Sequence, residues 1–230
     1  MTYPPPAPTY LGPPKFHGAA DNKPIHRVVI HGTVSPCKKG GARAIAAYFR
    51  TTVTTPSSAH YVVDPGEVVQ VTYDSVEAYH APPNIHSLGV ELCDPQTGKD
   101  GRWAYPAHEA MLHHAAELVA QLCAAYGVPV VRVGSAGLLS GRHGICGHVD
   151  VSNAWRQTTH TDPGDAFPWP HFMDLVRAAD PAPAPVKHYP NADTILAAAT
   201  KGAALSHGAR ARTYTKIRDL IRPYTTGGTP

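Results

Sequence analysis

Short apolar runs alternate with helical patterns between residues 27 and 179, and this alternation is the strongest constraint on the fold. The clearest helix is Pro106–Tyr126, whose apolar side chains recur at helical spacing and which Gly127 follows as a C-terminal cap. Further helices are predicted at Ala42–Thr52 and Trp169–Ala179. Because strands and helices interleave, we expect an α/β domain with a central mixed β-sheet flanked by helices.

Several short runs have the composition of strands. Arg27–His31 and Ser87–Leu92 are apolar and bounded by polar or turn-forming residues. The segment 58–71 contains two β-rich runs around an Asp-Pro-Gly sequence at 64–66, which predicts a hairpin. Val128–Val133 is the last predicted strand of the sheet.

The two ends of the chain differ in composition from this core. Residues 1–24 are rich in proline and lack periodicity, which is typical of an arm that covers part of a domain. Residues 181–230 begin as a Pro/Ala linker and continue with helical patterns at 192–204 and 215–221. This tail holds seven Lys and Arg against two Asp, so it carries the basic character of the chain. We therefore expect a central domain at residues 25–180.

Composition also limits the compartment and the partners. A formal net charge of +3 is too small to indicate nucleic-acid binding. No apolar run approaches the ~18 residues of a membrane span, and the first residues lack the pattern of a signal peptide. The four cysteines have no CxxC spacing, which favours free thiols over a zinc ribbon or a disulfide framework.

The segment Gly147–Gly164 carries the strongest chemical signal. It places His148, His160 and Asp162 on a stretch without apolar periodicity, so we expect a loop that presents ligands. Imidazole and carboxylate are both zinc ligands, and a catalytic site needs one more of them. His31 is the best candidate, because ligands in α/β folds tend to follow the carboxyl ends of strands.

Other residues have both a chemical and a structural interpretation. Glu91 lies in an apolar strand, where burial would raise its pKa toward that of a general base, although on an edge strand it would simply face solvent. His143 and Cys146 are alternative ligands, and a cysteine as fourth ligand would make the site structural. His60 and His80 are plausible substrate contacts.

The structural interpretations carry weight for each residue taken singly. A histidine after an apolar run usually ends a strand, and Asp-Pro-Gly at 162–164 is itself a turn signal. His108 and His113 are five residues apart rather than four, so they do not match a metalloprotease helix and are expected on a solvated face. Asp150 is interpreted as a turn-forming residue or a support for His148. Only the combination favours a metal site.

Five short motifs occur in a fixed order between residues 25 and 178. They are VIHGT at 29–33, AHYVVD at 59–64, YHA at 79–81, N..SLGVEL at 84–92, and GHVDV with THTDPG at 147–164. Taken as an ordered set, they resemble the zinc-dependent N-acetylmuramoyl-L-alanine amidase family. That family shares its fold with peptidoglycan-recognition proteins and with phage amidase lysins.

The resemblance implies a Zn²⁺ ion held by His31, His148 and Asp162. It implies hydrolysis of the amide between the lactyl group of muramic acid and L-alanine, with Glu91 activating the water. His160 occupies the place where many members carry a lysine that stabilises the oxyanion. An imidazole there carries a full charge only near or below pH ~6.5.

The resemblance also implies a groove for the glycan and the peptide stem, lined by His80 and Asn84. Ala59 stands where some phage-type members have a tyrosine, so no catalytic role is expected for Tyr61. The implied protein is a monomeric phage or prophage endolysin, made in the cytoplasm and acting on cell-wall peptidoglycan. Alternatives are a non-catalytic peptidoglycan-binding module of the same fold, a different zinc hydrolase, and a cytoplasmic amidase that recycles muropeptides.

Overall fold

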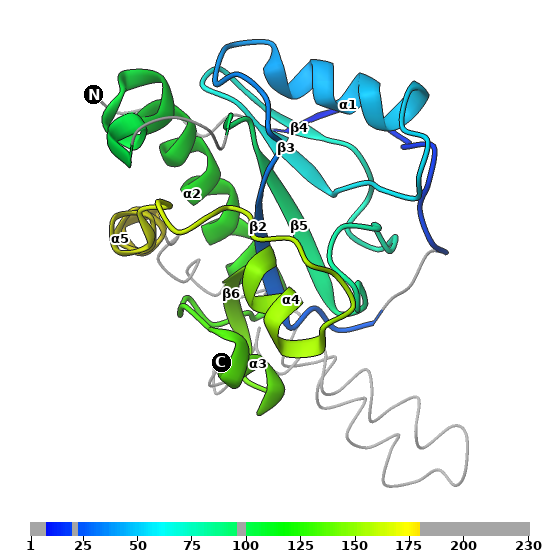
Figure 1. Cartoon of the computed structure of the whole chain (residues 1–230), viewed down its shortest axis with the longest axis vertical. Coiled ribbons are helices and arrows are strands. Elements are labelled where there is room, and N and C mark those ends of the chain that lie inside the picture. The colour runs from blue at the N-terminus through cyan, green and yellow to red at the C-terminus, as the bar shows by residue number, and fades with distance from the viewer. Residues whose placement is uncertain (1–7, 20–22, 96–99, 180–230) are drawn as a thin grey trace, which may run out of the picture. The chain divides into compact units, whose positions relative to one another are not determined.

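A mixed β-sheet lies at the centre of the computed structural model, which describes residues 8–19, 23–95 and 100–179 (Figure 1). In these residues the sheet has six strands in the order β1-β4-β3-β5-β2-β6. Only β3 and β4 pair antiparallel; the other neighbours are parallel. The predicted α/β fold with a mixed sheet is therefore confirmed. The strands are β1 (Thr9–Tyr10), β2 (Arg27–Gly32), β3 (Tyr61–Val63), β4 (Val68–Gln70), β5 (Ser87–Leu92) and β6 (Gly144–Gly147).

The chain divides into two units, residues 1–180 and 181–230. All described residues belong to the first unit. The predicted helices at 192–204 and 215–221 lie outside the described residues. From the proline-rich arm, the described part contributes β1, which pairs with β4 at one edge of the sheet.

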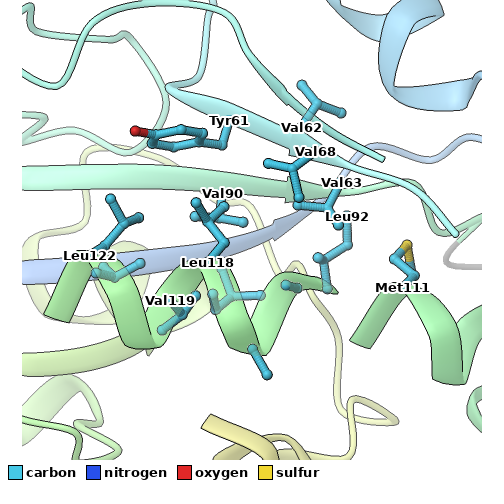
Figure 2. Close-up of a cluster of buried hydrophobic side chains, with 14 of the residues drawn as sticks. Tyr61, Val62, Val63, Val68, Val90, Leu92, Met111, Leu118, Val119 and Leu122 are labelled. Atoms are coloured by element: carbon cyan, nitrogen blue, oxygen red, sulfur yellow. The ribbon is translucent and has the colours of Figure 1, made fainter. Parts of the chain in front are cut away.

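The longest helix covers one face of the sheet. The helices are α1 (Gly41–Thr51), the 3-10 turn η1 (Asp100–Ala104), α2 (Pro106–Tyr126), α3 (Ser135–Leu139), α4 (His148–Trp155) and α5 (Trp169–Ala179). Leu118 of α2 is part of the same buried cluster as Val90 of β5, and α5 packs alongside α2 (Figures 1 and 2). As predicted, Gly127 ends α2 in the left-handed conformation, with φ 65°. This apolar layer supplies most of the buried core.

The opposite face of the sheet carries Glu91 and His31 beside apolar side chains such as Val62. Val62 points away from α2 (Figure 2), and it is paired in register with Glu91, which is paired with His31. Because side chains alternate along a strand, these three residues share one face. α1 contacts β3 and β4, while α4 contacts β2 and β6. A glutamate and a histidine therefore lie side by side on the sheet between two helices.

The prediction of a strand at Val128–Val133 is wrong. This segment makes a single bridge, between Arg132 and Ile145. Pro129 has no N–H to donate, and β6 takes the edge position beside β2. Neither β6 nor α3 was predicted, because each has at most five residues and contains glycine.

The prediction of an irregular loop over Gly147–Gly164 is wrong in its first half, which forms α4. The Asp150 carboxylate accepts a hydrogen bond of 2.7 Å from the backbone N–H of Gly147, and this contact caps the helix. Val151, a residue of this helix, is fully buried. Asp150, which was interpreted as turn-forming, thus caps the start of α4. His148 is the first residue of that helix.

Candidate active site

His31, His148 and Asp162 lie together at the carboxyl end of the sheet. His31 is near the end of β2, His148 begins α4, and Asp162 follows that helix; all three are buried. The Nδ1 atoms of the two histidines lie 3.0 and 3.2 Å from separate oxygens of the Asp162 carboxylate. The potential donor atoms of the three residues all lie within 4.8 Å of one another. The structure thus brings together the three ligands proposed from the sequence.

This donor set fits a divalent transition metal. Two imidazoles and a carboxylate are typical of hydrolytic zinc sites, which keep a fourth position open. Burial alone would raise the pKa of Asp162, but the neighbouring rings of His148 and His31 hold that pKa well below its ordinary value. An ionised carboxylate therefore faces two imidazole rings inside the protein, and a cation would complete the arrangement. No other group of His, Cys, Asp or Glu in the described residues is arranged in this way.

Glu91 lies beside His31 because the two residues are register partners on the parallel strands β5 and β2. Its strand is in the interior of the sheet rather than at an edge, and its side chain lines the pocket at the metal site. Desolvation by burial, together with the charge of Asp162, raises the pKa of Glu91 well above its ordinary value. A carboxyl group with a raised pKa is suited to accepting and releasing a proton.

His160 lies at the mouth of the pocket with an exposed side chain. Its ring stacks on His148, with 4.6 Å between centroids and 12° between planes. Its Nδ1 atom lies 3.7 Å from the Asp162 carboxylate. Desolvation and the neighbouring His148 lower the pKa of His160. The ring is therefore a neutral hydrogen-bonding group at pH 7 rather than a fixed charge of the lysine kind.

His60 does not line the pocket, in contrast to its predicted role as a substrate contact. The side chain is buried, and both ring nitrogens have partners. Nε2 lies 3.0 Å from the carbonyl of Val76, and Nδ1 lies 3.0 Å from the backbone nitrogen of Gly89. His60 directly precedes β3, and its backbone bonds to Gly89 and to Val71, so it is held in the interior beside the strands.

His80 and Asn84 line the pocket, but both have partners within the protein. The two ring nitrogens of His80 contact His31 and Ser87, each at 3.0 Å. The side-chain oxygen of Asn84 accepts hydrogen bonds from the backbone N–H groups of His80 and Ala81. Both residues therefore support the site, and only part of each faces the pocket.

The site opens into a pocket of about 850 Å³. One wall comes from α1 and was not predicted from the sequence: Ile45, Tyr48 and Phe49 line it. Their helical spacing is also that of an ordinary core stripe, so no sequence signal separates the two roles. Tyr48 is 45% exposed, which identifies it as a wall residue. At the rim, Val34 is exposed and adopts φ 53°, a strained conformation for a β-branched residue.

The alternative ligands lie elsewhere. Cys146 is buried in a small apolar cluster with Val29, and His143 stacks on His26. His108 was expected on a solvated helix face, but it is buried and its Nε2 lies 3.1 Å from the Asp94 carboxylate. The helical pattern places His108 among polar residues, which is why exposure was expected. The expectation was wrong because the buried Asp94 supplies a partner for the His108 ring inside the protein.

A family comparison agrees with the geometry. Residues 21–165 match the model of a family described as N-acetylmuramoyl-L-alanine amidase. The matched segment contains His31, Glu91, His148 and Asp162. The chain therefore belongs to the N-acetylmuramoyl-L-alanine amidase family.

Individual relatives cover part of the chain. A probable N-acetylmuramoyl-L-alanine amidase of Bacillus licheniformis is 36% identical over 127 residues, covering 47% of this chain and 33% of that protein. The N-acetylmuramoyl-L-alanine amidase CwlL of the same organism is 34% identical over 128 residues, covering 47% and 32%. The chain thus matches about a third of the length of these relatives. The crystal structure of the Staphylococcus aureus hydrolase AmiA shares the fold, with a TM-score of 0.61 at 16% identity over 77% of this chain and 85% of that one.

Proposed function

We propose that the chain is a zinc-dependent N-acetylmuramoyl-L-alanine amidase that cleaves the amide between muramic acid and L-alanine in peptidoglycan. The observation that carries the proposal is the convergence of His31, His148 and Asp162 beside Glu91 in one pocket. Membership of the family supports the choice of scissile bond, because the donor set alone suits several classes of zinc hydrolase.

The proposed zinc ligands are His31, His148 and Asp162. A zinc ion bound there would act as a Lewis acid toward the scissile carbonyl and would make water more acidic. Because both imidazoles are neutral ligands, Asp162 would contribute the only negative charge to the site. With Zn²⁺ bound, the site would keep a net positive charge, which would attract the electron-rich oxygen of the scissile carbonyl.

Glu91 is the proposed proton carrier. Its carboxylate takes a proton from the attacking water and delivers that proton to the alanine nitrogen, so that the amine leaves uncharged. Its position beside His31 and its raised pKa suit both transfers. His160 donates a hydrogen bond to the carbonyl oxygen as negative charge develops there.

We propose that the glycan and the stem lie in the pocket between α1 and the segment that carries His160. Tyr48 offers an exposed ring against which a sugar can pack. The carboxamide oxygen of Asn84 is used within the protein, so its amide nitrogen is the group that remains for the substrate. His80 offers a ring edge, and His60 does not reach the pocket.

Peptidoglycan is the proposed partner, and we propose that a monomer acts at the bacterial cell wall in the manner of a phage or prophage endolysin. No helix in the part of the chain that the structure describes is long and apolar enough to cross a membrane. The tail, with seven Lys and Arg against two Asp, suits the anionic polymers of a wall.

Digestion of purified peptidoglycan, followed by mass spectrometry of the soluble products, tests the function. We expect stem peptides that begin with a free L-alanine, and no such products from Glu91→Gln. Cleavage inside the stem would identify a different hydrolase. Binding without cleavage would identify a recognition module, and cleavage of soluble anhydro-muropeptides alone would identify a recycling enzyme.

A further inference from the structure

A chain of polar contacts runs from the candidate metal site into the protein behind His31. His31 Nε2 lies 3.0 Å from His80 Nδ1, and His80 Nε2 lies 3.0 Å from Ser87 Oγ. The Ser87 hydroxyl donates in turn to the backbone carbonyl of Asn84. His31, His80 and Ser87 are all buried, so each contact must be satisfied within the protein.

The protons in this chain can be assigned from its far end. The carbonyl of Asn84 can only accept, so the single hydroxyl proton of Ser87 is committed to it. His80 Nε2 must then donate to Ser87 Oγ. A buried histidine ring that holds its one proton on Nε2 accepts at its other nitrogen. Its Nδ1 is therefore an acceptor, and the donor that faces it is His31 Nε2.

This assignment leaves the electron pair of His31 Nδ1 directed at the Asp162 carboxylate. Two electron-pair donors 3.0 Å apart repel each other unless a proton or a cation lies between them. His148 Nδ1 approaches the other oxygen of the same carboxylate at 3.2 Å. A cation at the meeting point of these three donors satisfies all of them at once.

The protein holds His80 in this orientation from three sides. Its backbone N–H donates to Asn84 Oδ1 over 3.0 Å. Its ring packs on Gly89, where an added Cβ would lie 2.7 Å from the His80 Cγ and Nδ1 atoms. The His60 ring meets it edge-on, with 5.6 Å between centroids, and is itself fixed because Nδ1 accepts from the Gly89 N–H. The His80 ring therefore has little freedom to turn over.

We infer that His80, together with Ser87, is a positioning residue for the metal centre that fixes His31 as the tautomer with its proton on Nε2. This role, which rests on the proposed function of the triad as a metal site, is additional to the proposed contact between His80 and substrate. Hydrogen-bond partners of metal-binding histidines affect metal affinity by about 10–100-fold. Ser87 does not line the pocket, so its hydroxyl can be removed without changing the pocket wall.

The zinc dissociation constant of the full chain, measured by competition with a chromogenic chelator, tests the role of each partner. Ser87→Ala and His80→Leu should each weaken zinc binding by about 10–100-fold. His80→Asn should recover most of the affinity, because the asparagine Oδ1 can accept from His31 Nε2. Ser140→Ala is the matched control, since it removes another hydroxyl that donates to a carbonyl but contacts no histidine ring in the described structure. Its zinc affinity should not change.

Long-range ¹H–¹⁵N spectra of the histidine rings, recorded on the full chain with and without zinc, test the tautomers directly. His80 should carry its proton on Nε2 in both states, and His31 should do so when zinc is bound. A proton on His80 Nδ1 would overturn the inference, as would an unchanged zinc affinity in a folded Ser87→Ala. Expected tautomers and affinities without cleavage of peptidoglycan would instead refute only the proposed function.

Discussion

Two groups of three histidines lie on the same part of the sheet, one at the amino ends of the strands and the other around His31 near the carboxyl end of β2. At the amino end, His26, His86 and His143 directly precede strands β2, β5 and β6. The ring of His26 lies between the other two, with centroid distances of 4.4 and 4.1 Å and interplanar angles of 8° and 12°. The three rings form a nearly parallel stack.

Around His31, the rings meet at steep angles instead. His31 forms interplanar angles of 82° with His80 and 66° with His148. Electron pairs of nitrogen lie in the plane of the ring, so parallel rings direct them along separate planes, whereas steeply inclined rings can direct them to one point. The carboxylate of Asp162 lies at that point. A metal site thus depends on ring orientation and a carboxylate, and fifteen histidines in the chain do not by themselves indicate one.

The largest effect is expected at Asp162, because its carboxylate distinguishes the candidate metal site from the histidine stack at the amino end. Asp162→Asn keeps the shape of the side chain but removes its charge, so bound zinc and more than about 10³-fold of the turnover should be lost. Atomic emission gives the zinc per chain, and peptidoglycan digestion gives the rate. His143→Ala, at the amino end, should keep both; loss of zinc there would mean that the stack binds metal.

Glu91→Gln should lower turnover by about 10²–10⁴-fold while zinc binding persists, because glutamine cannot carry a proton between water and the leaving amine. Single-turnover digestion and the zinc content distinguish this outcome from loss of metal. Glu109→Gln, at a half-buried position of α2 that does not line the pocket, is the control. A Glu91→Gln variant with the wild-type rate would exclude Glu91 as the proton carrier.

His160→Ala should have a smaller effect, about 10²-fold or less, because one hydrogen-bond donor at an exposed position is removed. The loss should appear in kcat rather than KM, since the donor acts on charge that develops during reaction. A change in KM alone would assign His160 to substrate binding.

The smallest effect concerns the stack at the amino end. Burial, with the charges of His143, His86 and Arg27, lowers the pKa of His26. A histidine with a folded pKa below its unfolded value stabilises the fold above about pH 6.5, and this contribution is lost as the pH falls toward the folded pKa. Thermal stability should therefore decline between about pH 7 and 5, and His143→Gln should make that decline shallower. Melting curves across this range would show equal slopes if the stack does not sense charge.

Local sequence patterns predicted the elements whose stabilising contacts lie within their own residues. α2 follows its own apolar spacing and ends at Gly127, and the hairpin of β3 and β4 follows from its turn. In that turn Asp64 accepts hydrogen bonds from the N–H groups of Gly66 and Glu67, a contact made within four residues. Short elements such as β6 depend on strands elsewhere in the chain, so their patterns are weak.

The candidate site was predictable as a set of residues but not as an arrangement. The ordered motifs identified His31, His148 and Asp162 as candidate ligands and Glu91 as the candidate base from the sequence alone. His60 was predicted as a substrate contact from its residue type, although the structure buries it. The burial and the orientation of a histidine ring depend on neighbours that are distant in the chain. The spacing of residues in a motif therefore does not predict either property.

By itself, the sequence determined the α/β class, the long helix and the residue types of a metal site, because apolar periodicity, turn chemistry and ligand identity are local properties. Only the tertiary structure decided that α4 begins at His148, that α1 forms a wall of the pocket, and that His80 contacts His31. These features arise where separate segments meet. They depend on packing and on the sharing of protons between side chains that are distant in sequence.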